Sequence, residues 1–194
     1  FVYRAIEHHN LKKENLNLNS KLFHSYELIG QSSAIVKIRD LVDKLSNTES
    51  RVFITGPTGS GKELIARKIH KKSKRSKKSF VIINGALLEP GKYENELFGS
   101  ENKDGTVGYG AFEKAMGGTL LIDEIAEITL ETQAKILRVL IDQKFKRING
   151  VKEINVNFRL ISTSNKEIRK EIENGNFRED LYHRLNVVPI VLPS

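Results

Sequence analysis

The stretch RVFITGPTGSGKE, residues 51–63, decides the fold. It starts as a short apolar run typical of a buried strand, passes through a glycine-rich loop and enters a helix that begins at Lys62. Glycines let the backbone N–H groups of such a loop turn toward a phosphate, and the helix N-terminus adds positive potential. The residues predicted to contact a nucleotide here are Gly56, Pro57, Thr58, Gly59, Ser60, Gly61, Lys62 and Glu63.

One position departs from the common form of this loop. Glu63 follows Lys62, where a phosphate-binding loop usually has Ser or Thr to place a hydroxyl on Mg²⁺. Taken alone, the loop is therefore a near match, and an ordinary glycine-rich turn stays open as the alternative.

A second stretch, TLLIDE at residues 119–124, favours the nucleotide site over that alternative. It is an apolar strand that ends in two acidic residues, which is how a phosphate-loop ATPase holds its metal and polarises water. Asp123 is predicted to hold Mg²⁺, and Glu124 to act as general base. The loop and the acidic pair together predict a site for ATP and Mg²⁺.

Strand-like and helical segments alternate on both sides of these motifs. Apolar runs at residues 80–83 and 158–163 and a helix from Leu130 continue the pattern. Such alternation predicts an α/β fold with a mostly parallel, five-stranded sheet flanked by helices. Asn149-Gly150 lies between two further strand-like runs and predicts a tight β-hairpin.

Composition narrows the class of protein. The 194 residues include no cysteine, which excludes disulfides and thiolate chemistry, and the five histidines lack a metal-ligand spacing. No apolar run approaches the roughly 20 residues that a membrane helix needs, and the N-terminus lacks the apolar stretch of a signal peptide. These features predict a cytoplasmic protein with no membrane partner.

The net charge of +8 is compatible with a polyanionic partner. Its densest part is KKSKRSKKS at residues 71–79, between a predicted helix and a predicted strand. The run has no interleaved aromatic residues, so a solvated loop is favoured, and a nucleic-acid patch is the alternative.

The chain has two predicted parts. Residues 1–25 are interpreted as a polar linker helix, ended by an asparagine-rich stretch, and residues 26–194 as a compact α/β domain.

Several motifs resemble one known family, the AAA+ (sigma-54 interaction) domain of the NtrC-like bacterial enhancer-binding proteins. The resemblance runs from about Leu28 to Pro193, and Glu commonly follows the loop lysine in that family. The motifs that carry it are ELIGQSSAI, GPTGSGKE, FVIINGALL, ENELFGSE, GGTLLIDEIAEITLETQAKILRVL, FRLISTSN and FREDLYHRLNVVPIVLP. The family would continue into a helical lid and a helix-turn-helix, and the linker would follow a phosphoacceptor receiver domain.

The resemblance implies roles for further residues. Asn84 resembles the asparagine that restrains the catalytic glutamate, and Asn165 the sensor I residue that reads the γ-phosphate. Ile29 and Gly30, in ELIGQSSAI, match positions that contact the nucleotide.

Arg178 and Arg184 in FREDLYHRL resemble the arginines that are donated to the ATP of a neighbouring subunit. A guanidinium stays protonated and carries a planar fork of donors, which suits a transferring phosphoryl group. The alternative is a solvated helix face with local ion pairs to Glu179 and Asp180.

One family motif is missing. Sigma-54 activators carry a GAFTGA loop after ELFG, whereas residues 100–110 here read SENKDGTVGYG. Lys103 and Asp104 stand where the family presents an aromatic residue and a threonine. Absence of this loop is typical of the NtrX-like response regulators, so the chain resembles that subgroup most.

The resemblance implies ATP binding and hydrolysis in a homo-oligomer, from a dimer to a ring, under a two-component sensor histidine kinase. DNA and the kinase would be bound by domains outside this chain, and the sigma-54 contact of RNA polymerase is in doubt. One alternative is a DNA-bound regulator whose nucleotide site governs oligomerisation with little hydrolysis. Another is a phosphate-loop ATPase such as a helicase loader, which ELFG and FREDLYHRLNV disfavour.

Overall fold

The computed structural model describes residue 28 and residues 30–193. The chain divides into two units, Phe1–Arg39 and Asp40–Ser194. In the first unit, Nη2 of Arg39 donates to the carbonyl oxygens of Leu28 and Gly30, at 2.8 and 3.1 Å. The predicted linker helix over residues 1–25 and its boundary lie outside the described residues and stay predictions.

The central sheet has five strands, and every pair of neighbours in it is parallel. In spatial order the strands are β2 (Phe80–Asn84), β5 (Thr119–Asp123), β8 (Arg159–Ser164), β1 (Val52–Thr55) and β9 (Val188–Val191). This confirms the predicted α/β fold with its mostly parallel five-stranded sheet.

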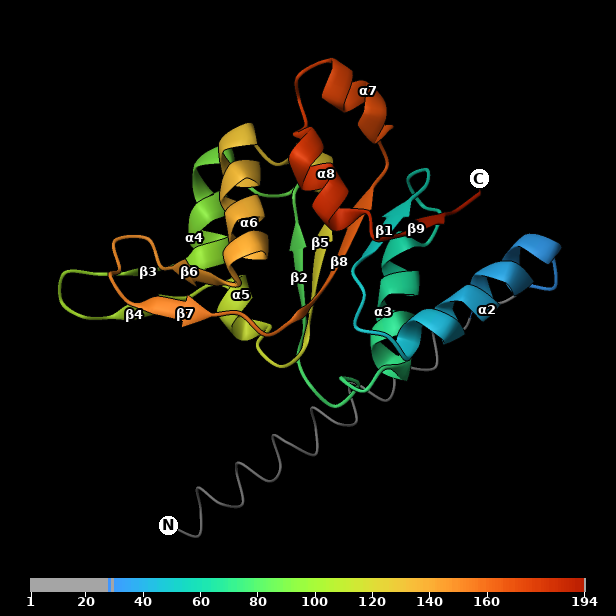
Figure 1. The fold of residues 1–194 in the computed structure, drawn as a ribbon, viewed down its shortest axis with the longest axis horizontal. Coiled ribbons are helices and arrows are strands. Elements are labelled where there is room, and N and C mark those ends of the chain that lie inside the picture. The colour runs from blue at the N-terminus through green and yellow to red at the C-terminus, as the bar shows by residue number, and fades with distance from the viewer. Residues whose placement is uncertain (1–27, 29, 194) are drawn as a thin grey trace, which may run out of the picture. The chain divides into compact units, whose positions relative to one another are not determined.

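Helices connect and cover these strands (Figure 1). In chain order they are α2 (Ser33–Ser46), α3 (Lys62–Lys72), α4 (Tyr93–Phe98), α5 (Ala111–Lys114), α6 (Leu130–Asp142), α7 (Ile168–Glu173) and α8 (Glu179–Leu185). Two single turns of 3₁₀ helix, Pro90–Lys92 and Ile125–Glu127, precede α4 and follow β5.

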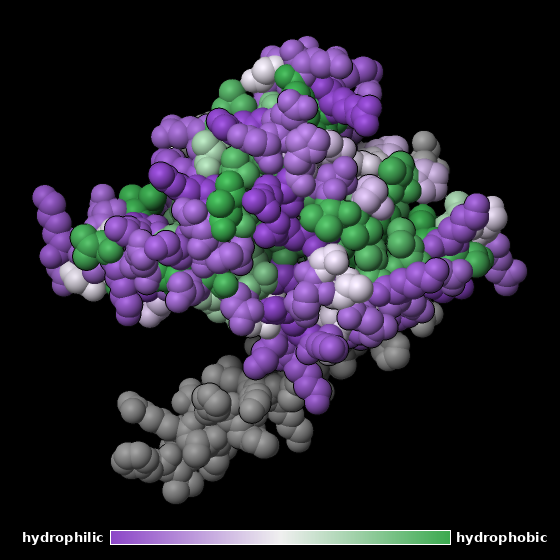
Figure 2. Space-filling view, in the orientation of Figure 1, coloured by the Kyte–Doolittle hydropathy of each residue, from purple (hydrophilic) through white to green (hydrophobic). Residues whose placement is uncertain are grey.

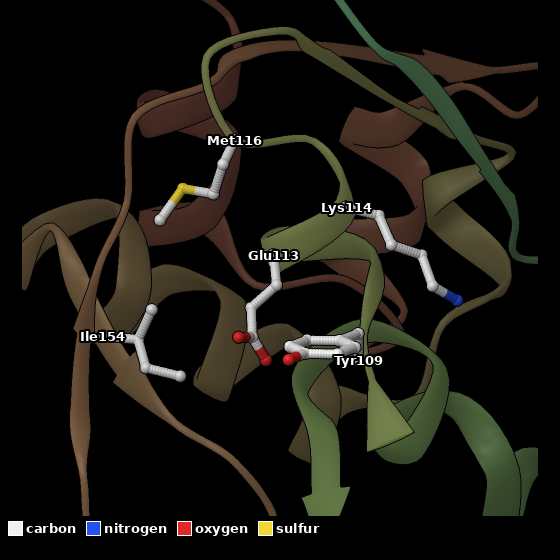
Figure 3. Close-up of a pocket in the computed structure, with 5 residues that line it drawn as sticks. All are labelled: Tyr109, Glu113, Lys114, Met116 and Ile154. Carbon is white, nitrogen blue, oxygen red and sulfur yellow. The ribbon is translucent and has the colours of Figure 1, made fainter. Parts of the chain in front are cut away.

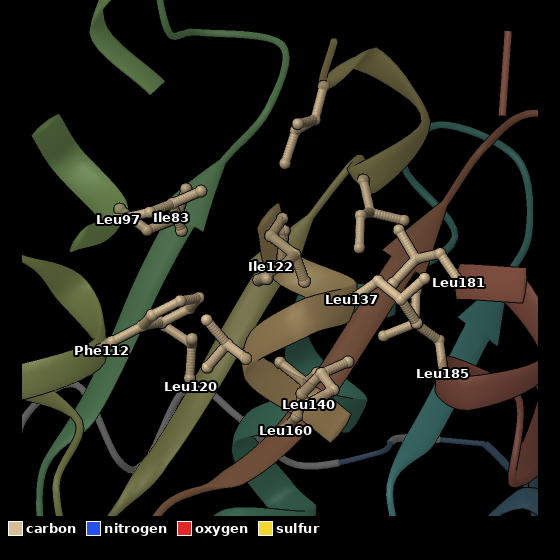
Figure 4. Close-up of a cluster of buried hydrophobic side chains, with 14 of the residues drawn as sticks. Ile83, Leu97, Phe112, Leu120, Ile122, Leu137, Leu140, Leu160, Leu181 and Leu185 are labelled. Carbon is tan, nitrogen blue, oxygen red and sulfur yellow. The ribbon is translucent and has the colours of Figure 1, made fainter. Parts of the chain in front are cut away.

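The alternation of side chains along the strands gives the sheet two buried faces. On β5, Leu120 and Ile122 belong to a large cluster with residues of α4, α5, α6 and α8 (Figure 4). Leu121 points to the opposite face, because successive side chains of a strand alternate. Helix α3 contacts β5 and β8, and its Ile65 and Ile69 are fully buried. Because both faces of the sheet are covered, the sequence of β5 is a continuous apolar run and does not alternate with polar residues.

Two small antiparallel hairpins lie outside the sheet. They are formed by β3 (Gly99–Glu101) with β4 (Val107–Tyr109), and by β6 (Lys144–Lys146) with β7 (Glu153–Asn155). The first is rooted on two glycines: a Cβ on Gly99 would lie 2.3 Å from the carbonyl oxygen of Gly108, and one on Gly110 would lie 2.3 Å from the backbone nitrogen of Gly99.

The second hairpin differs from its prediction. Asn149, with φ at 61°, does lie in the connection, but the strands end at Lys146 and resume at Glu153, so the turn is longer than a tight one. The backbone of Ile148 explains the extra length, because it bonds to the first hairpin instead. Its N–H donates to Gly99 and its carbonyl oxygen accepts from Glu101, both at 3.0 Å.

Candidate nucleotide site

The glycine-rich loop connects β1 to α3 at the carboxyl edge of the sheet. Gly59 and Gly61 have φ values of 81° and 89°, the left-handed region that glycine adopts without a steric penalty. The backbone N–H groups of Thr58, Gly59 and Gly61 donate to no other group among the described residues. The first N–H groups of α3 are likewise without intrahelical acceptors. The loop therefore offers a row of free donors to an anion.

The side chain of Lys62 lies inside this loop. Its Nζ donates to the carbonyl oxygens of Gly56 and Pro57, at 3.0 and 3.2 Å, and lies 3.2 Å from Oε1 of Glu124. The residue is 6% exposed. A buried ammonium is costly unless it is bonded, and these three oxygens supply its partners.

Asp123 ends β5 and is held from both neighbouring strands. Its Oδ2 accepts from Nδ2 of Asn84 on β2 at 3.0 Å, and its Oδ1 accepts from the hydroxyl of Thr163 on β8 at 2.5 Å. Parallel pairing explains the contacts, because Asn84 lies beside Asp123 in the register, and Thr163 follows the last paired residue of β8. The carboxylate is thus fixed at the centre of the sheet edge.

Glu124 has a left-handed backbone, with φ at 52°, which a residue with a side chain seldom adopts. Its N–H donates to Oγ1 of Thr163 at 3.0 Å, and its Oε2 accepts from the N–H of Asn165 at 2.8 Å. With Oε1 on Lys62, both carboxylate oxygens have a partner. Backbone strain of this kind persists where the surroundings determine the conformation, and it is common at functional sites.

The structure brings most of the predicted site residues together. Lys62, Asp123, Glu124, Asn165 and Asn84 form one connected network, and Nδ2 of Asn165 also reaches Oγ1 of Thr58 at 3.3 Å. Glu63 lies apart from that network, because its carboxylate pairs with Arg67 one helical turn later, at 2.6 Å.

The partner of Asn84 differs from the expectation. Its amide bonds to Asp123 and its Oδ1 accepts from the N–H of Ala86, whereas the residue bonded to Glu124 is Asn165. Restraint of Glu124 by Asn84 is absent from this arrangement of the described residues and stays a prediction for another state of the site.

Thr163 is a site residue that the sequence analysis missed. It is fully buried, and its one hydroxyl links the carboxylate of Asp123 to the backbone of Glu124. The signal was a threonine near the end of FRLISTSN, on a strand adjacent to TLLIDE. The role of Thr163 can be inferred from this pattern only when the strand order and register are known.

The two arginines of FREDLYHRL lie on an exposed segment. Arg178 precedes α8, and its guanidinium makes a two-pronged contact with Asp180, at 3.0 and 2.7 Å. Hydrogen bonds from Arg178 lower the pKa of Asp180. Arg184 is exposed, and within the described part of the chain its side chain has no ion-pair or hydrogen-bond partner. The alternative stated from the sequence was a solvated helix face with local ion pairs. Among the described residues, Arg178 forms such an ion pair and Arg184 does not.

Of the two nucleotide contacts expected in ELIGQSSAI, Ile29 lies outside the described residues. Gly30 is described, with φ at 140°, and its carbonyl oxygen is bonded to Arg39. Its contact with a nucleotide stays a prediction.

A separate pocket of about 310 Å³ lies between α5 and the second hairpin, lined by Tyr109, Glu113, Lys114, Met116 and Ile154. Figure 3 shows Met116 and Ile154 on one side of it, and Tyr109 and Lys114 on the other. Its lining is mostly apolar and includes no glycine-rich loop, so it does not fit a triphosphate.

Two kinds of feature are absent from residues 28 and 30–193. No cluster of three or more histidine, aspartate or glutamate side chains has the geometry of a metal site. No helix there is long and apolar enough to span a membrane.

The strand order, the loop between β1 and α3 and the acidic end of β5 define an AAA+ phosphate-loop nucleoside triphosphatase core. The family model of the sigma-54 interaction domain matches residues 28–191. The chain belongs to this family, which confirms the resemblance stated from the motifs.

Two similar proteins, one of them in two crystal structures, illustrate the relationship. The nitrogen assimilation regulatory protein NtrX of Azorhizobium caulinodans is 47% identical over 191 residues, 98% of this chain and 42% of that protein. The crystal structure of NtrX from Brucella abortus with ADP has a TM-score of 0.88 at 44% identity, over all of this chain and 44% of that one. The crystal structure of the same Brucella protein with ATP has a TM-score of 0.85 at 42% sequence identity, again over all of this chain and 44% of that one. The chain thus spans less than half the length of these relatives.

Proposed function

We propose that this domain binds ATP with Mg²⁺ and hydrolyses it at the subunit interfaces of a homo-oligomer, as part of a two-component response regulator that controls transcription. The observation that carries the proposal is the position of Lys62 inside a loop of free N–H groups, paired with a doubly held Glu124. The nucleotides in the Brucella abortus NtrX structures support it.

The residues of the site fit a nucleotide. The hydroxyl oxygen of Ser60 in the loop is buried and without a partner among the described residues, in addition to the free N–H groups. Buried polar groups in proteins are seldom left unpaired, so such orphans favour a missing ligand. We infer that the phosphates lie in this loop, where Lys62 exchanges its carbonyl partners for phosphate oxygens.

The residues also fit Mg²⁺, which prefers oxygen ligands and is usually held by one or two carboxylates with phosphate and water. Asp123 supplies such a carboxylate at the sheet edge, held by Asn84 and Thr163. When bound, the ion neutralises charge on the phosphate oxygens. Glu63, engaged by Arg67, is not required for this ligand set.

Hydrolysis requires that Glu124 gives up its ion pair. When Lys62 turns to the phosphates, Oε1 of Glu124 becomes free to accept a proton from water, while the N–H of Asn165 still holds Oε2. Asn165, which also reaches Thr58 in the loop, connects the base to the phosphate-binding segment. Arg178 and Arg184 would complete the site of a neighbouring subunit.

The wider biology rests on the resemblance to the NtrC-like and NtrX-like regulators. By analogy with them we propose a cytoplasmic protein that binds DNA and a sensor histidine kinase through regions outside this chain.

A second candidate function is a nucleotide-dependent oligomerisation switch with little hydrolysis and no remodelling of the sigma-54 polymerase. The hairpin that replaces the GAFTGA loop favours it. Its tip is exposed and polar, and Asp104 is bonded to both the hydroxyl and the N–H of Thr106. An interface anchor usually supplies apolar or aromatic contact, which this tip lacks.

The ATPase rate per subunit, measured against protein concentration for the full-length protein, separates the two functions. A shared active site predicts a rate that rises with concentration, and Glu124→Gln should abolish this rise while ATP binding persists, because the amide keeps the shape and loses basicity. A flat, near-zero rate with ATP binding retained would favour the switch. Loss of ATP binding by the unmodified protein would contradict both.

A further inference from the structure

The last two residues of α3 and its connection to β2, residues 71–79 together, form an ordered segment, which we call the basic turn. The hydroxyl of Ser73 donates to the carbonyl oxygen of His70 at 2.7 Å and accepts the N–H of Arg75 at 3.1 Å. The N–H of Ser76 donates to Ser73, and that of Lys78 to Arg75, at 3.1 and 2.8 Å. The solvated loop predicted from the sequence is therefore present, and turn hydrogen bonds hold its backbone.

Arg75 anchors the basic turn to the rest of the domain. Its Nε contacts Oε2 of Glu49 at 2.8 Å, its Nη1 donates to the carbonyl oxygen of Gly118 at 3.2 Å, and its Nη2 donates to Oδ1 of Asn157 at 3.0 Å. The side chain is only 18% exposed. Arg75 therefore stabilises the fold, and its guanidinium is largely occupied by contacts within the domain.

Three lysines of the turn face solvent without a partner among the described residues. Lys72 pairs with Asp43, but Lys74, Lys77 and Lys78 are exposed and have no side-chain partner within the described part of the chain. The turn itself contains no acidic residue. The carboxylates of Asp43 and Glu49 are already engaged, by Lys72 and Arg75. An ordered backbone thus presents three uncompensated ammonium groups close together in sequence.

The basic turn lies at the opposite end of the sheet from the nucleotide site. It precedes β2 and contacts Gly118, which precedes β5, so it is at the amino ends of the parallel strands (Figure 1). Helix α3, with its 11 residues, separates it from the phosphate loop by about 16 Å. The surface around the start of β2 is hydrophilic (Figure 2). A polyanion held here is therefore distinct from the nucleotide.

We propose that the basic turn binds the phosphate backbone of duplex DNA without reading its sequence. Lysine ammonium groups and serine hydroxyls are common phosphate partners, and Ser76 and Ser79 are exposed beside the lysines. The turn has no aromatic side chain for stacking on unpaired bases, which favours a duplex over a single strand. It also has no exposed apolar side chain to enter a bilayer, which favours nucleic acid over a lipid surface.

The test is the binding of a labelled duplex of about 30 base pairs, of arbitrary sequence, followed by fluorescence anisotropy over a range of salt concentrations. The triple variant Lys74→Gln, Lys77→Gln, Lys78→Gln should bind at least about tenfold more weakly at low salt. Because each lost phosphate contact lowers the salt slope by about 0.9, the slope should fall by about 2 to 3. These exposed side chains form no hydrogen bond or ion pair among the described residues, so the melting temperature should stay unchanged.

A matched control removes equal charge from the two hairpins: Lys103→Gln, Lys146→Gln, Lys152→Gln. All three are exposed lysines, and this variant should keep the wild-type affinity and slope. Replacing the turn lysines with arginine should preserve binding. An equal loss in both glutamine variants would reduce the effect to net charge and overturn the proposal. So would unchanged DNA binding in the turn variant together with lost binding to phosphatidylglycerol vesicles, which would indicate a membrane surface.

Discussion

Lys62 and Arg184 are two cations expected to act on ATP, Lys62 on that of its own subunit and Arg184 on that of a neighbour, and their surroundings in the structure differ. Lys62 is 6% exposed and bonded to Gly56, Pro57 and Glu124 of its own chain. Arg184 is exposed on α8 and has no side-chain partner in the described part of the molecule. The first needs nothing beyond its own subunit to be positioned. The second has no such partner among the described residues, and its proposed donation across a subunit interface stays a prediction.

Arg178 stands between these extremes. Its contact with Asp180 is solvent-exposed, and such pairs are weakened by screening and are readily exchanged for a better partner. The Lys62–Glu124 pair is largely buried, and removing one member would leave the other charge without its partner. The three residues therefore differ in what their loss should do, and this can be measured.

The largest effect is expected for Lys62→Ala. The substitution removes the ammonium group from the phosphate loop and leaves Glu124 unpaired, so nucleotide affinity should fall by about a hundredfold or more. Isothermal titration calorimetry with ATP measures the loss. Lys72→Ala, at the other end of the same helix, is the control and should bind normally. Unchanged affinity in Lys62→Ala would remove the basis for the nucleotide site.

The second largest effect is expected for the exposed arginine, Arg184. Arg184→Ala should leave ATP binding to the monomer intact and lower hydrolysis by about a thousandfold, the usual contribution of an arginine finger. Arg178→Ala should also lower hydrolysis, because Arg178 is expected to leave Asp180 and act on the ATP of the neighbouring subunit. Arg138→Ala, on the exposed face of α6, removes the same charge and should have no effect.

Mixing the variants shows whether the arginine acts in trans. Combining Arg184→Ala with Glu124→Gln should restore part of the activity, because some mixed interfaces then contain one intact arginine and one intact base. If activity fails to recover at any ratio, Arg184 serves its own subunit and the contrast with Lys62 disappears.

The smallest effect concerns the network around Lys62. Thr163→Val keeps the shape of the side chain and removes the hydroxyl that links Asp123 to Glu124. Leaving a buried donor and acceptor unpaired costs about 1–3 kcal/mol, so the midpoint of urea unfolding should fall. Hydrolysis should fall about tenfold because the base loses its positioning. Thr163→Ser retains the hydroxyl and should restore both; a Ser variant as impaired as Val would assign Thr163 to packing.

The sequence predicted those parts of the site that depend on one element and its neighbours in the chain. The loop from Gly56 to Glu63 and the acidic end of TLLIDE are local patterns with a physical purpose, and the structure places both at the carboxyl edge of the expected sheet. Apolar runs likewise predicted β1, β2, β5 and β8, and helices were predicted from Lys62 and Leu130, whereas the shorter helices and the first hairpin were not.

What the sequence left out depends on pairing between distant segments. Thr163 reaches Asp123 only because β8 lies beside β5, and Asn84 reaches it because β2 lies on the other side. The order of the basic turn likewise depends on Arg75 meeting Asn157, far along the chain. No local pattern contains the register that creates these contacts. The roles of Arg178 and Arg184 depend on a second subunit and stay predictions.

The glycine root of the first hairpin has a consequence for how this fold can diversify. Gly99 and Gly110 meet so closely that a methyl group on either would collide with backbone, whereas residues 102–109 are exposed. We infer that the attachment point is intolerant of change, while the exposed segment can be exchanged, lengthened or shortened without disturbing the central sheet. Proteins with this fold can therefore gain or lose a binding partner through changes in a few hairpin residues, while the nucleotide site stays unchanged.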